Sequence, residues 1–380
     1  MCQAARVLRD ADANAPADVG AVDVRRARRE PRRVDAANRV VLLGTGGAGN
    51  PKATRCGYAN AVVVGDDAYL VDCGEGVHRQ AWRAGIGMHE QRRPAGGAVV
   101  RSICFTHLHS DHVIDYPNLL FGLWPTHTVN VFGPGPAGLP IPVYPPERVI
   151  SLLYPDEPTP GLRGMTDHIF RALAYNLNER MADEGRHDVT RCIALHEIGV
   201  RRDDYTPDID LGVVASGASP ATSAPAMEPI EIQPTDANGV RVTATLVQHA
   251  PVFPALGYRF DTPTGSVVFS GDTGQCDNVA RLAQGADVLV HEVIDIDFVA
   301  RRVAKLANRD ALIAHLASAH STPAQAAEIA RRAGVRTLVL SHLVPGDDEV
   351  HEDEWESRAR PYFDGEIVCG VDLDQFALQR

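Results

Sequence analysis

Residues 106–112, with the sequence Thr-His-Leu-His-Ser-Asp-His, restrict the fold of this chain more than any other segment. They overlap the end of the apolar run VVRSICFTH at 99–107, which predicts a buried strand. Three imidazoles and a carboxylate at such a strand end are costly unless a cation pairs with them, so a solvated histidine-rich loop is the weaker interpretation. Neutral imidazole with carboxylate suits zinc, with manganese or iron as alternatives. The sequence predicts a metal site where this strand leads into a helix.

Other short apolar runs also predict buried strands. They lie at 40–46, 59–65, 68–74, 128–133, 240–249, 266–272, 286–292 and 335–342. Three of these runs end in a histidine or an aspartate, both common metal ligands, namely His249, Asp272 and His342. One such residue alone is more often part of a turn or a core. Together with residues 106–112, the three predict one shared site.

Short motifs then follow one another in a fixed order. They are LGTGGAGNPKATRCGYANAVVV, YLVDCGEG, THLHSDH, QHAPVFPALGYRF, FSGDTG, AHST and LSHL. This order resembles the metallo-β-lactamase superfamily, within it the ribonuclease Z-like branch that includes arylsulfatase-type and phosphodiesterase-type hydrolases. The resemblance covers most of 40–133 and 240–375 and implies an α/β fold, the αββα sandwich, with a helical insertion between its halves.

The resemblance also implies a ligand set for two metal ions, most simply two Zn²⁺, with Mn²⁺ or Fe²⁺ as alternatives. The first ion would be held by His107, His109 and His249, the second by Asp111, His112 and His342, with Asp272 bridging them. A hydroxide shared by two cations is a nucleophile near neutral pH, so the expected enzyme is a binuclear metal-dependent hydrolase.

Three residues are candidates for catalysis beyond metal binding. The resemblance implies that His320 stabilises the transition state or protonates the leaving group, and that Glu292 orients His320. Asp111 is the third candidate, in addition to its place in the ligand set. A helix-capping role for His320 and a surface position for Glu292 stay open. We expect Asp72, in VDCGEG, to stabilise the turns beneath the metal loop by hydrogen bonds rather than to be catalytic.

The chain divides into two predicted parts. Residues 1–36 predict a poorly ordered N-terminal extension, and residues 37–380 a hydrolase domain in which 134–229 is an inserted helical lid. The apolar spacing within 165–185 predicts a helix that starts near Thr166 or Asp167. A second helix is predicted to follow Thr322-Pro323 and to end at a glycine.

The charge of the chain bears on its substrate. The chain has a net charge of -12. Proteins that bind mainly to the phosphates of nucleic acids do so through clustered lysines and arginines, so this charge argues against such binding. Endonucleases of this branch carry a basic arm between the third-motif histidine and the bridging aspartate, whereas His249 and Asp272 are only 23 positions apart here. We therefore expect a small organic substrate, such as an ester or sulfate ester, with nucleic acid an unlikely partner.

Two alternatives to the small-molecule hydrolase stay open. The first is a ribonuclease Z-type tRNA 3′-processing endonuclease or a phosphodiesterase. The second is an inactive metal-binding protein, which is weaker because the full ligand set is present. No apolar run is long enough for a membrane span, and no signal region is evident, so the sequence predicts a cytoplasmic protein without a membrane partner. A homodimer stays open.

Overall fold

The computed structural model describes residues 29–50, 52–87, 93–141, 143, 148–213, 223–306, 308–346 and 350–379. Most of the predicted N-terminal extension, residues 1–28, lies outside the described residues. Residues 29–36 are described and contact the end of the chain: Arg29 pairs with Asp374, and Arg32 pairs with Glu366 at 2.8 Å. Within the described part, no helix has the length and apolar character needed to cross a membrane.

The first of two sheets collects strands from the N-terminal half and from the end of the chain. Its strand order is β16-β1-β2-β3-β5-β6-β7-β8, and β4 pairs with β5. The strands are β1 (Asn38–Gly44), β2 (Ala59–Val64), β3 (Asp67–Val71), β4 (Ile86–Gly87), β5 (Ala98–Cys104), β6 (Val129–Pro134), β7 (Ile193–Gly199), β8 (Ile209–Asp210) and β16 (Gln375–Ala377). From β3 through β8 the pairing is parallel.

The second sheet comes from the C-terminal half, in the order β15-β14-β13-β12-β11-β10-β9. Its strands are β9 (Ile230–Gln233), β10 (Arg241–Leu246), β11 (Leu256–Asp261), β12 (Ser266–Phe269), β13 (Val288–Ile294), β14 (Thr337–Val344) and β15 (Glu366–Cys369). The strands β12 to β15 are parallel, so their carboxyl ends lie at the same edge of the sheet. Every residue of β13 is buried, as expected for a parallel strand that is covered on both faces.

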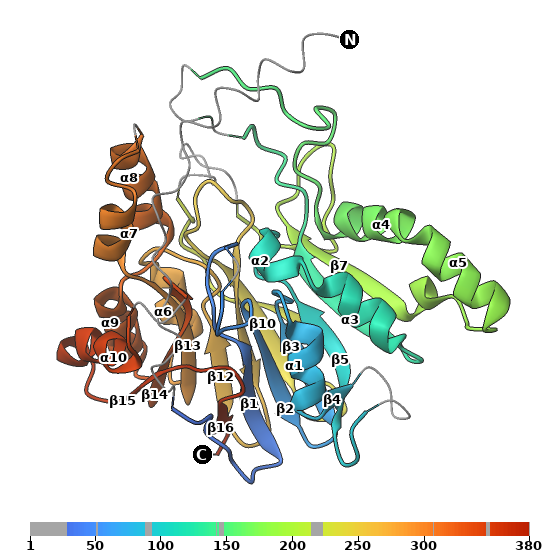
Figure 1. Cartoon of the computed structure of the whole chain (residues 1–380), viewed down its shortest axis with the longest axis horizontal. Helices are drawn as coiled ribbons and strands as arrows, with labels where there is room; N and C mark the ends of the chain where they lie inside the picture. The colour runs from blue at the N-terminus through green and yellow to red at the C-terminus, as the bar shows by residue number, and fades with distance from the viewer. Residues whose placement is uncertain are drawn as a thin grey trace.

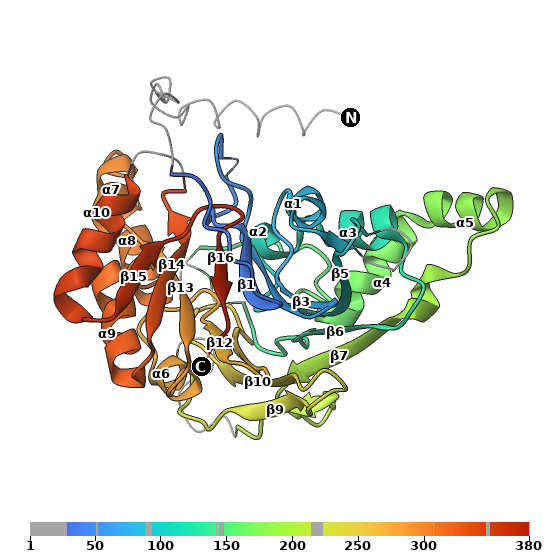
Figure 2. The same cartoon turned by 90° about the horizontal axis from the view of Figure 1, so that it is seen from below.

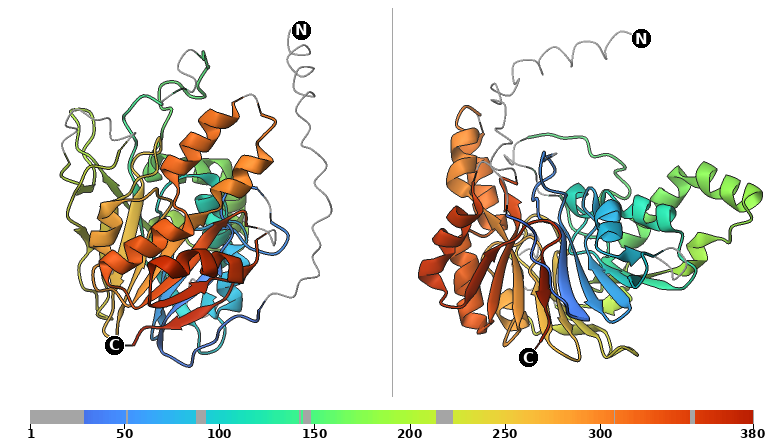
Figure 3. Two further views of the ribbon diagram at one scale, coloured as in Figure 1. Left: turned by 90° about the vertical axis from the view of Figure 1, so that its left-hand side faces the viewer. Right: turned by 60° about the horizontal axis from the view of Figure 1, so that its bottom comes forward.

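The sheets pack face to face, and helices cover their outer faces, as Figures 2 and 3 show. One apolar cluster between the sheets joins residues of both, among them Val40, Val62, Phe260 and Val339. A second cluster lies between the first sheet and its helices, and a third between the second sheet and its helices. The predicted αββα sandwich is therefore confirmed.

The helices of the two outer layers come from different halves of the chain (Figure 1). Those of the first sheet's side are α1 (Val77–Arg83), α2 (Ser110–Val113), α3 (Tyr116–Leu123), α4 (Leu162–Ala172) and α5 (Ala174–Asp183). Those of the second sheet's side are α6 (Asp277–Leu282), α7 (Ile296–Arg302), α8 (Arg309–Ala319), α9 (Pro323–Ala333) and α10 (Glu352–Ala359). Within the described ranges, short 3₁₀ helices also span Val189–Cys192 and Arg360–Tyr362.

The predicted helix after Thr322 is α9, and local chemistry sets both of its ends. Thr322 accepts a hydrogen bond from the Gln325 backbone N–H, and the Gln325 side chain accepts one from the Thr322 N–H in return. Pro323 occupies the first turn, and Gly334 ends the helix at a φ of 66°. Because only three residues, 320–322, separate the end of α8 from this helix, the cap also fixes the position of His320.

The segment 134–229 differs in part from the helical insertion that the sequence predicts. It contributes β7 and β8 to the first sheet, and its helix is divided into α4 and α5, with α4 starting at Leu162 rather than near Thr166. The apolar side of this helix pair packs beside α3, where Phe170 contacts Phe121 and Leu177 shares a cluster with Trp124. The covering role of the segment stays a prediction.

Candidate metal centre

The predicted metal ligands meet at the edge where the strands β5, β10, β12 and β14 end. His107 and His109 follow β5, and α2 then carries Asp111 and His112. His249, Asp272 and His342 come from the ends of β10, β12 and β14. All seven residues that the sequence singled out as ligands lie in this one cluster, although β10 and β12 end about three residues earlier than the apolar runs predict.

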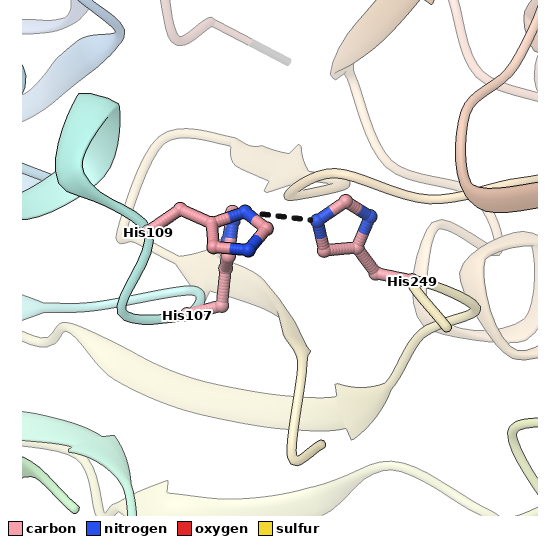
Figure 4. A group of neighbouring side chains, drawn as sticks. All are labelled: His107, His109 and His249. Carbon is pink, nitrogen blue, oxygen red and sulfur yellow. Dashed lines mark hydrogen bonds between the residues drawn. The ribbon is translucent and has the colours of Figure 1, made fainter. Parts of the chain in front are cut away.

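The first group consists of His107, His109 and His249. Their candidate ligand atoms all lie within 4.8 Å of one another, and His109 Nδ1 is 3.4 Å from His249 Nε2. Figure 4 shows the three rings converging from two segments that are 140 positions apart in sequence. His107 and His249 are buried, whereas His109 is exposed toward the opening of the site.

The second group consists of Asp111, His112 and His342. His342 Nε2 lies 3.3 Å from His112 Nε2 and 3.4 Å from Asp111 Oδ2. His342 interrupts the pairing of β14 with β13, because Ser341 pairs with Glu292 and Leu343 with Val293. Its φ of 46° is in the left-handed region, and this bulge turns the imidazole into the cluster.

Asp272 lies between the two groups. Its Oδ2 atom is 4.0 Å from His107 Nε2 and 3.9 Å from His249 Nε2. Its Oδ1 atom is 3.4 Å from His112 Nε2 and 3.2 Å from His342 Nε2. Each carboxylate oxygen therefore faces one group, which is the arrangement that a bridging ligand needs.

Hydrogen bonds behind the rings orient their Nε2 atoms toward the cluster. Asp72 Oδ2 is 2.9 Å from His112 Nδ1, and Asp72 also accepts bonds from the Thr106 N–H and hydroxyl at 2.8 Å each. His249 Nδ1 lies 3.1 Å from the carbonyl oxygen of Ala319. A ring that donates through Nδ1 keeps the lone pair of Nε2 for a metal. The predicted role of Asp72 in hydrogen bonding is confirmed, and it extends to a candidate ligand.

Burial and charge set the protonation of the cluster. Burial lowers the pKa of His107 well below its ordinary value and that of His249 to about 3, so both rings are neutral. Burial alone raises the pKa of Asp272, but the charges of His342 and His112 outweigh it and hold that pKa well below the usual range. His107, His249 and Asp272 are thus in the forms that bind metal ions. Burial lowers the pKa of His112, but Asp272 and Asp72 outweigh it and raise that pKa well above its ordinary value, so a metal has to displace a proton from this ring.

His320 and Glu292 form a pair beside the two groups. His320 Nδ1 is 3.1 Å from Glu292 Oε1, and the same oxygen accepts bonds from the Thr273 and Ser321 N–H groups at 2.9 and 3.2 Å. Glu292 is fully buried, which excludes the surface position that the sequence left open. Burial would lower the pKa of His320, but the charge and hydrogen bond of Glu292 outweigh it and raise the pKa to about 9.

His320 is also close enough to be considered as a ligand. Its ring, His249 and Asp272 offer atoms within 4.8 Å of one another, and His320 Nδ1 is 4.0 Å from Asp272 Oδ2. The division between seven ligands and one proton donor therefore stays a prediction, to be tested by metal content.

A cavity of about 470 Å³ opens beside His109. Its described walls are mostly apolar and come from both sides of the site. They include Leu108, residues 134, 135, 137 and 139–141, residues 158–160, Met165, and residues 251–254. The proline-rich N-terminal edge of the 134–229 segment thus borders the metal centre, whereas Tyr175 of α5 is 83 % exposed and away from any cluster.

Two features of the site escaped the sequence analysis. Tyr58, which is fully buried, places its ring centroid 5.4 Å from that of His112 and 5.3 Å from that of His342, so it supports both imidazoles. Gly47 lies so close to His342 that a Cβ atom there would meet its Nδ1 at 2.6 Å. Both residues lie within the motif at 43–64, but nothing local in that motif indicates which histidine each would contact.

Comparisons with known proteins agree with this geometry. Residues 54–133 match the Metallo-beta-lactamase superfamily profile, and residues 201–343 match the Beta-lactamase superfamily domain profile. A curated protein named Ribonuclease Z from Mycobacterium bovis (strain BCG / Pasteur 1173P2) is 32% identical over 334 residues, which are 88% of this chain and 96% of that protein. Ribonuclease Z from Mycobacterium avium (strain 104) is 33% identical with the same coverage.

A solved structure shares the fold at lower identity. Human tRNase Z, short form, matches with a TM-score of 0.53 and 20% identity, covering 90% of this chain and 100% of that one. At this identity the match concerns the architecture of the sandwich.

Proposed function

Because the chain belongs to the ribonuclease Z-like branch of the metallo-β-lactamase superfamily, we propose that it is a metal-dependent endonuclease that cleaves precursor tRNA at its 3′ side. The observation that carries the proposal is the pair of ligand groups around Asp272, because two cations about one carboxylate suit hydrolysis of a phosphodiester. The names and coverage of the curated relatives support this substrate.

The expectation of a small organic substrate, with nucleic acid an unlikely partner, is wrong. Relatives named Ribonuclease Z align with 88% of this chain and with 96% of their own length, which favours the endonuclease. The net charge is a poor guide to the substrate because it sums over the whole surface, whereas phosphate binding depends on local charge. The short spacing between His249 and Asp272 excludes a basic arm between these two residues, but it does not exclude an RNA-binding surface elsewhere on the protein.

The residues of the cluster fit a pair of metal ions. His107 Nε2 and Asp272 Oδ1 are buried atoms without a hydrogen-bond partner among the described residues, which is costly unless a cation pairs with them. We assign His107, His109 and His249 to one ion, Asp111, His112 and His342 to the other, and Asp272 to both. Five imidazoles and two carboxylates suit Zn²⁺, with Mn²⁺ or Fe²⁺ as alternatives.

The protein's own groups have distinct parts in the reaction. Bound divalent ions would lower the pKa of water and draw charge from a phosphate oxygen. Glu292 holds His320 through Nδ1, which keeps this ring protonated at neutral pH and leaves Nε2 to donate. As water attacks phosphorus and the bond to the leaving ribose oxygen breaks, His320 supplies the proton that this oxygen takes up. The open side at His109 leaves room for the nucleotides that flank the cleaved bond.

A cleavage assay tests the proposal. Purified protein with two equivalents of Zn²⁺ is incubated with a precursor tRNA that carries a 3′ trailer, and the products are sized at nucleotide resolution. We expect one cut at the 3′ end of the tRNA body, and no cut by Asp272→Ala. Turnover of aryl esters or aryl sulfates by a folded, metal-loaded protein that leaves precursor tRNA intact would overturn the assignment.

A further inference from the structure

The helix pair α7–α8, residues 296–319, leaves the sandwich beside the candidate metal centre. It begins two residues after β13 ends at Ile294, and β13 carries Glu292. Its last residue, Ala319, is followed directly by His320, whose ring bonds Glu292 at 3.1 Å. The α7–α8 pair is thus anchored at both ends to the proposed proton donor, and a ligand held by it has a fixed position relative to the cleaved bond.

The α7–α8 pair adds almost nothing to the hydrophobic core. Among its described residues only Ala319 is buried, and none belongs to the four apolar clusters of the described chain. Phe298, Val299, Leu312 and Ile313 are only half-buried. Figures 1 and 3 show the pair projecting beyond the sheets at the end where β13 and β14 point. Because these helices contribute little to the core, most of their surface is exposed and can contact a binding partner.

The projecting end of the pair carries local positive charge. Arg301, Arg302, Lys305 and Arg309 are all exposed and lie within nine positions, where the sequence holds no acidic residue. The guanidinium groups of Arg301 and Arg302 lie over the Phe298 ring, at 5.9 and 6.0 Å from its centroid, and this contact limits their freedom.

The exposed acids of the pair, Asp297 in the first turn of α7 and Asp310 in that of α8, leave an excess of two positive charges among its described residues. Asp310 lies 3.2 Å from Arg309, but both side chains are exposed, and such surface pairs contribute little. In a chain with a net charge of -12, four cations at this end form a local surface of opposite sign.

We propose that the α7–α8 pair binds the phosphate backbone of the RNA substrate and holds it to the metal centre, in place of an arm between His249 and Asp272. This rests on the proposed function and specifies where the tRNA is gripped. The eleven residues of α8 rise about 16 Å from Arg309 to the end beside His320. Arg309 is therefore separated from His320 by about 16 Å along the helix axis, so the phosphate that it contacts lies away from the scissile bond, toward the body of the tRNA. A polyanion is the partner that complements this surface.

The test changes the four cations together and compares them with a matched set. The first variant carries Arg301→Gln, Arg302→Gln, Lys305→Gln and Arg309→Gln. The control carries four exposed arginines changed in the same way, each outside the metal centre: Arg241, Arg281, Arg331 and Arg336. Both variants lose four positive charges from exposed side chains, at different places on the surface. The measurements are the Kd for mature tRNA, KM and kcat for precursor tRNA, and hydrolysis of bis(p-nitrophenyl) phosphate, all at several salt concentrations.

We expect the α7–α8 variant to bind tRNA at least roughly tenfold more weakly at low salt, with a shallower dependence of log Kd on log salt, because each lost phosphate contact removes about 0.7–0.9 from that slope. KM for precursor tRNA should rise similarly, while hydrolysis of the small diester, which cannot reach Arg309, stays at the wild-type rate. Equal effects in the α7–α8 variant and the control, or none in either, would overturn the proposal.

Failure of the proposed function gives a different result. A wild-type protein that binds tRNA through this surface but cleaves no precursor would contradict the proposed endonuclease activity. It would still support RNA binding by the α7–α8 pair. A wild-type protein that binds no tRNA at all contradicts both.

Discussion

Asp72→Asn is the substitution that most directly tests how the protein prepares its metal centre. Asp72 is fully buried and connects Thr106 to His112 by three contacts of 2.8 to 2.9 Å. An asparagine retains one oxygen for the Thr106 N–H but presents an NH₂ group where the second oxygen was. His112 Nδ1 then faces a hydrogen-bond donor and has to accept, so the ring proton moves to Nε2. Nε2 is the atom nearest to Asp272 and His342, where the metal would bind.

The magnitude follows from these contacts. Loss of the carboxylate behind a metal-binding imidazole costs roughly 10–100-fold in metal affinity, which is about 1.4–2.7 kcal/mol. The free energy of unfolding of the metal-free protein should also fall by about 1–3 kcal/mol, because a buried hydrogen bond to a charged group is lost. The effect on metal should concentrate on the ion at His112 and His342.

The assay measures zinc content after dialysis against a graded chelator, together with urea unfolding of the metal-free protein. Asp374→Asn is the matched control, because Asp374 is also fully buried and bonds Arg29 and the Arg32 and Val371 N–H groups, but none of the ligands. The control should lose stability and keep its zinc affinity. Wild-type zinc affinity in Asp72→Asn would refute the reasoning that this carboxylate fixes the tautomer of His112.

Further predictions concern the ligands and the proton donor. Asp272→Ala should lower zinc content at both positions, whereas His249→Ala should retain close to one equivalent, as measured by elemental analysis. His320→Ala should keep both ions and lower kcat by roughly 10²–10⁴; loss of an ion would instead make His320 a ligand. Glu292→Gln should move the alkaline limit of the kcat–pH profile to lower pH, because Glu292 raises the pKa of His320; an unchanged profile contradicts this. The pKa of His249 is lowered to about 3, so between pH 6.5 and 3 only the unfolded ring takes up a proton. The metal-free protein should therefore lose stability as the pH falls in this range, by up to about 1.4 kcal/mol per pH unit from this residue, and urea unfolding of His249→Gln should show a smaller loss.

The relation of the α7–α8 pair to the rest of the surface explains why total charge is a poor guide to substrate. Most acidic residues of this chain are distributed over the surface, and many pair with arginines close in sequence or space, as Glu184 does with Arg180 at 2.6 Å. A polyanion meets only the face that carries the active site. The four cations between 301 and 309 are few in number, but they belong to the helix pair whose last residue directly precedes His320.

The sequence by itself determined the features that depend on short segments. The cluster 106–112 and the strand-ending residues His249, Asp272 and His342 could be identified because each follows an apolar run, and parallel strands bring their ends to one edge. The helix 323–333 could be predicted because its capping residues are its own neighbours. Tertiary structure alone decided which partners meet across the chain: Asp72 with His112, Tyr58 with two imidazoles, β16 with β1, and β7 and β8 in the first sheet. It also decided that 296–319 projects from the sandwich rather than packing on it. Such contacts depend on where the whole chain closes its two sheets, and no local pattern of residues encodes that closure.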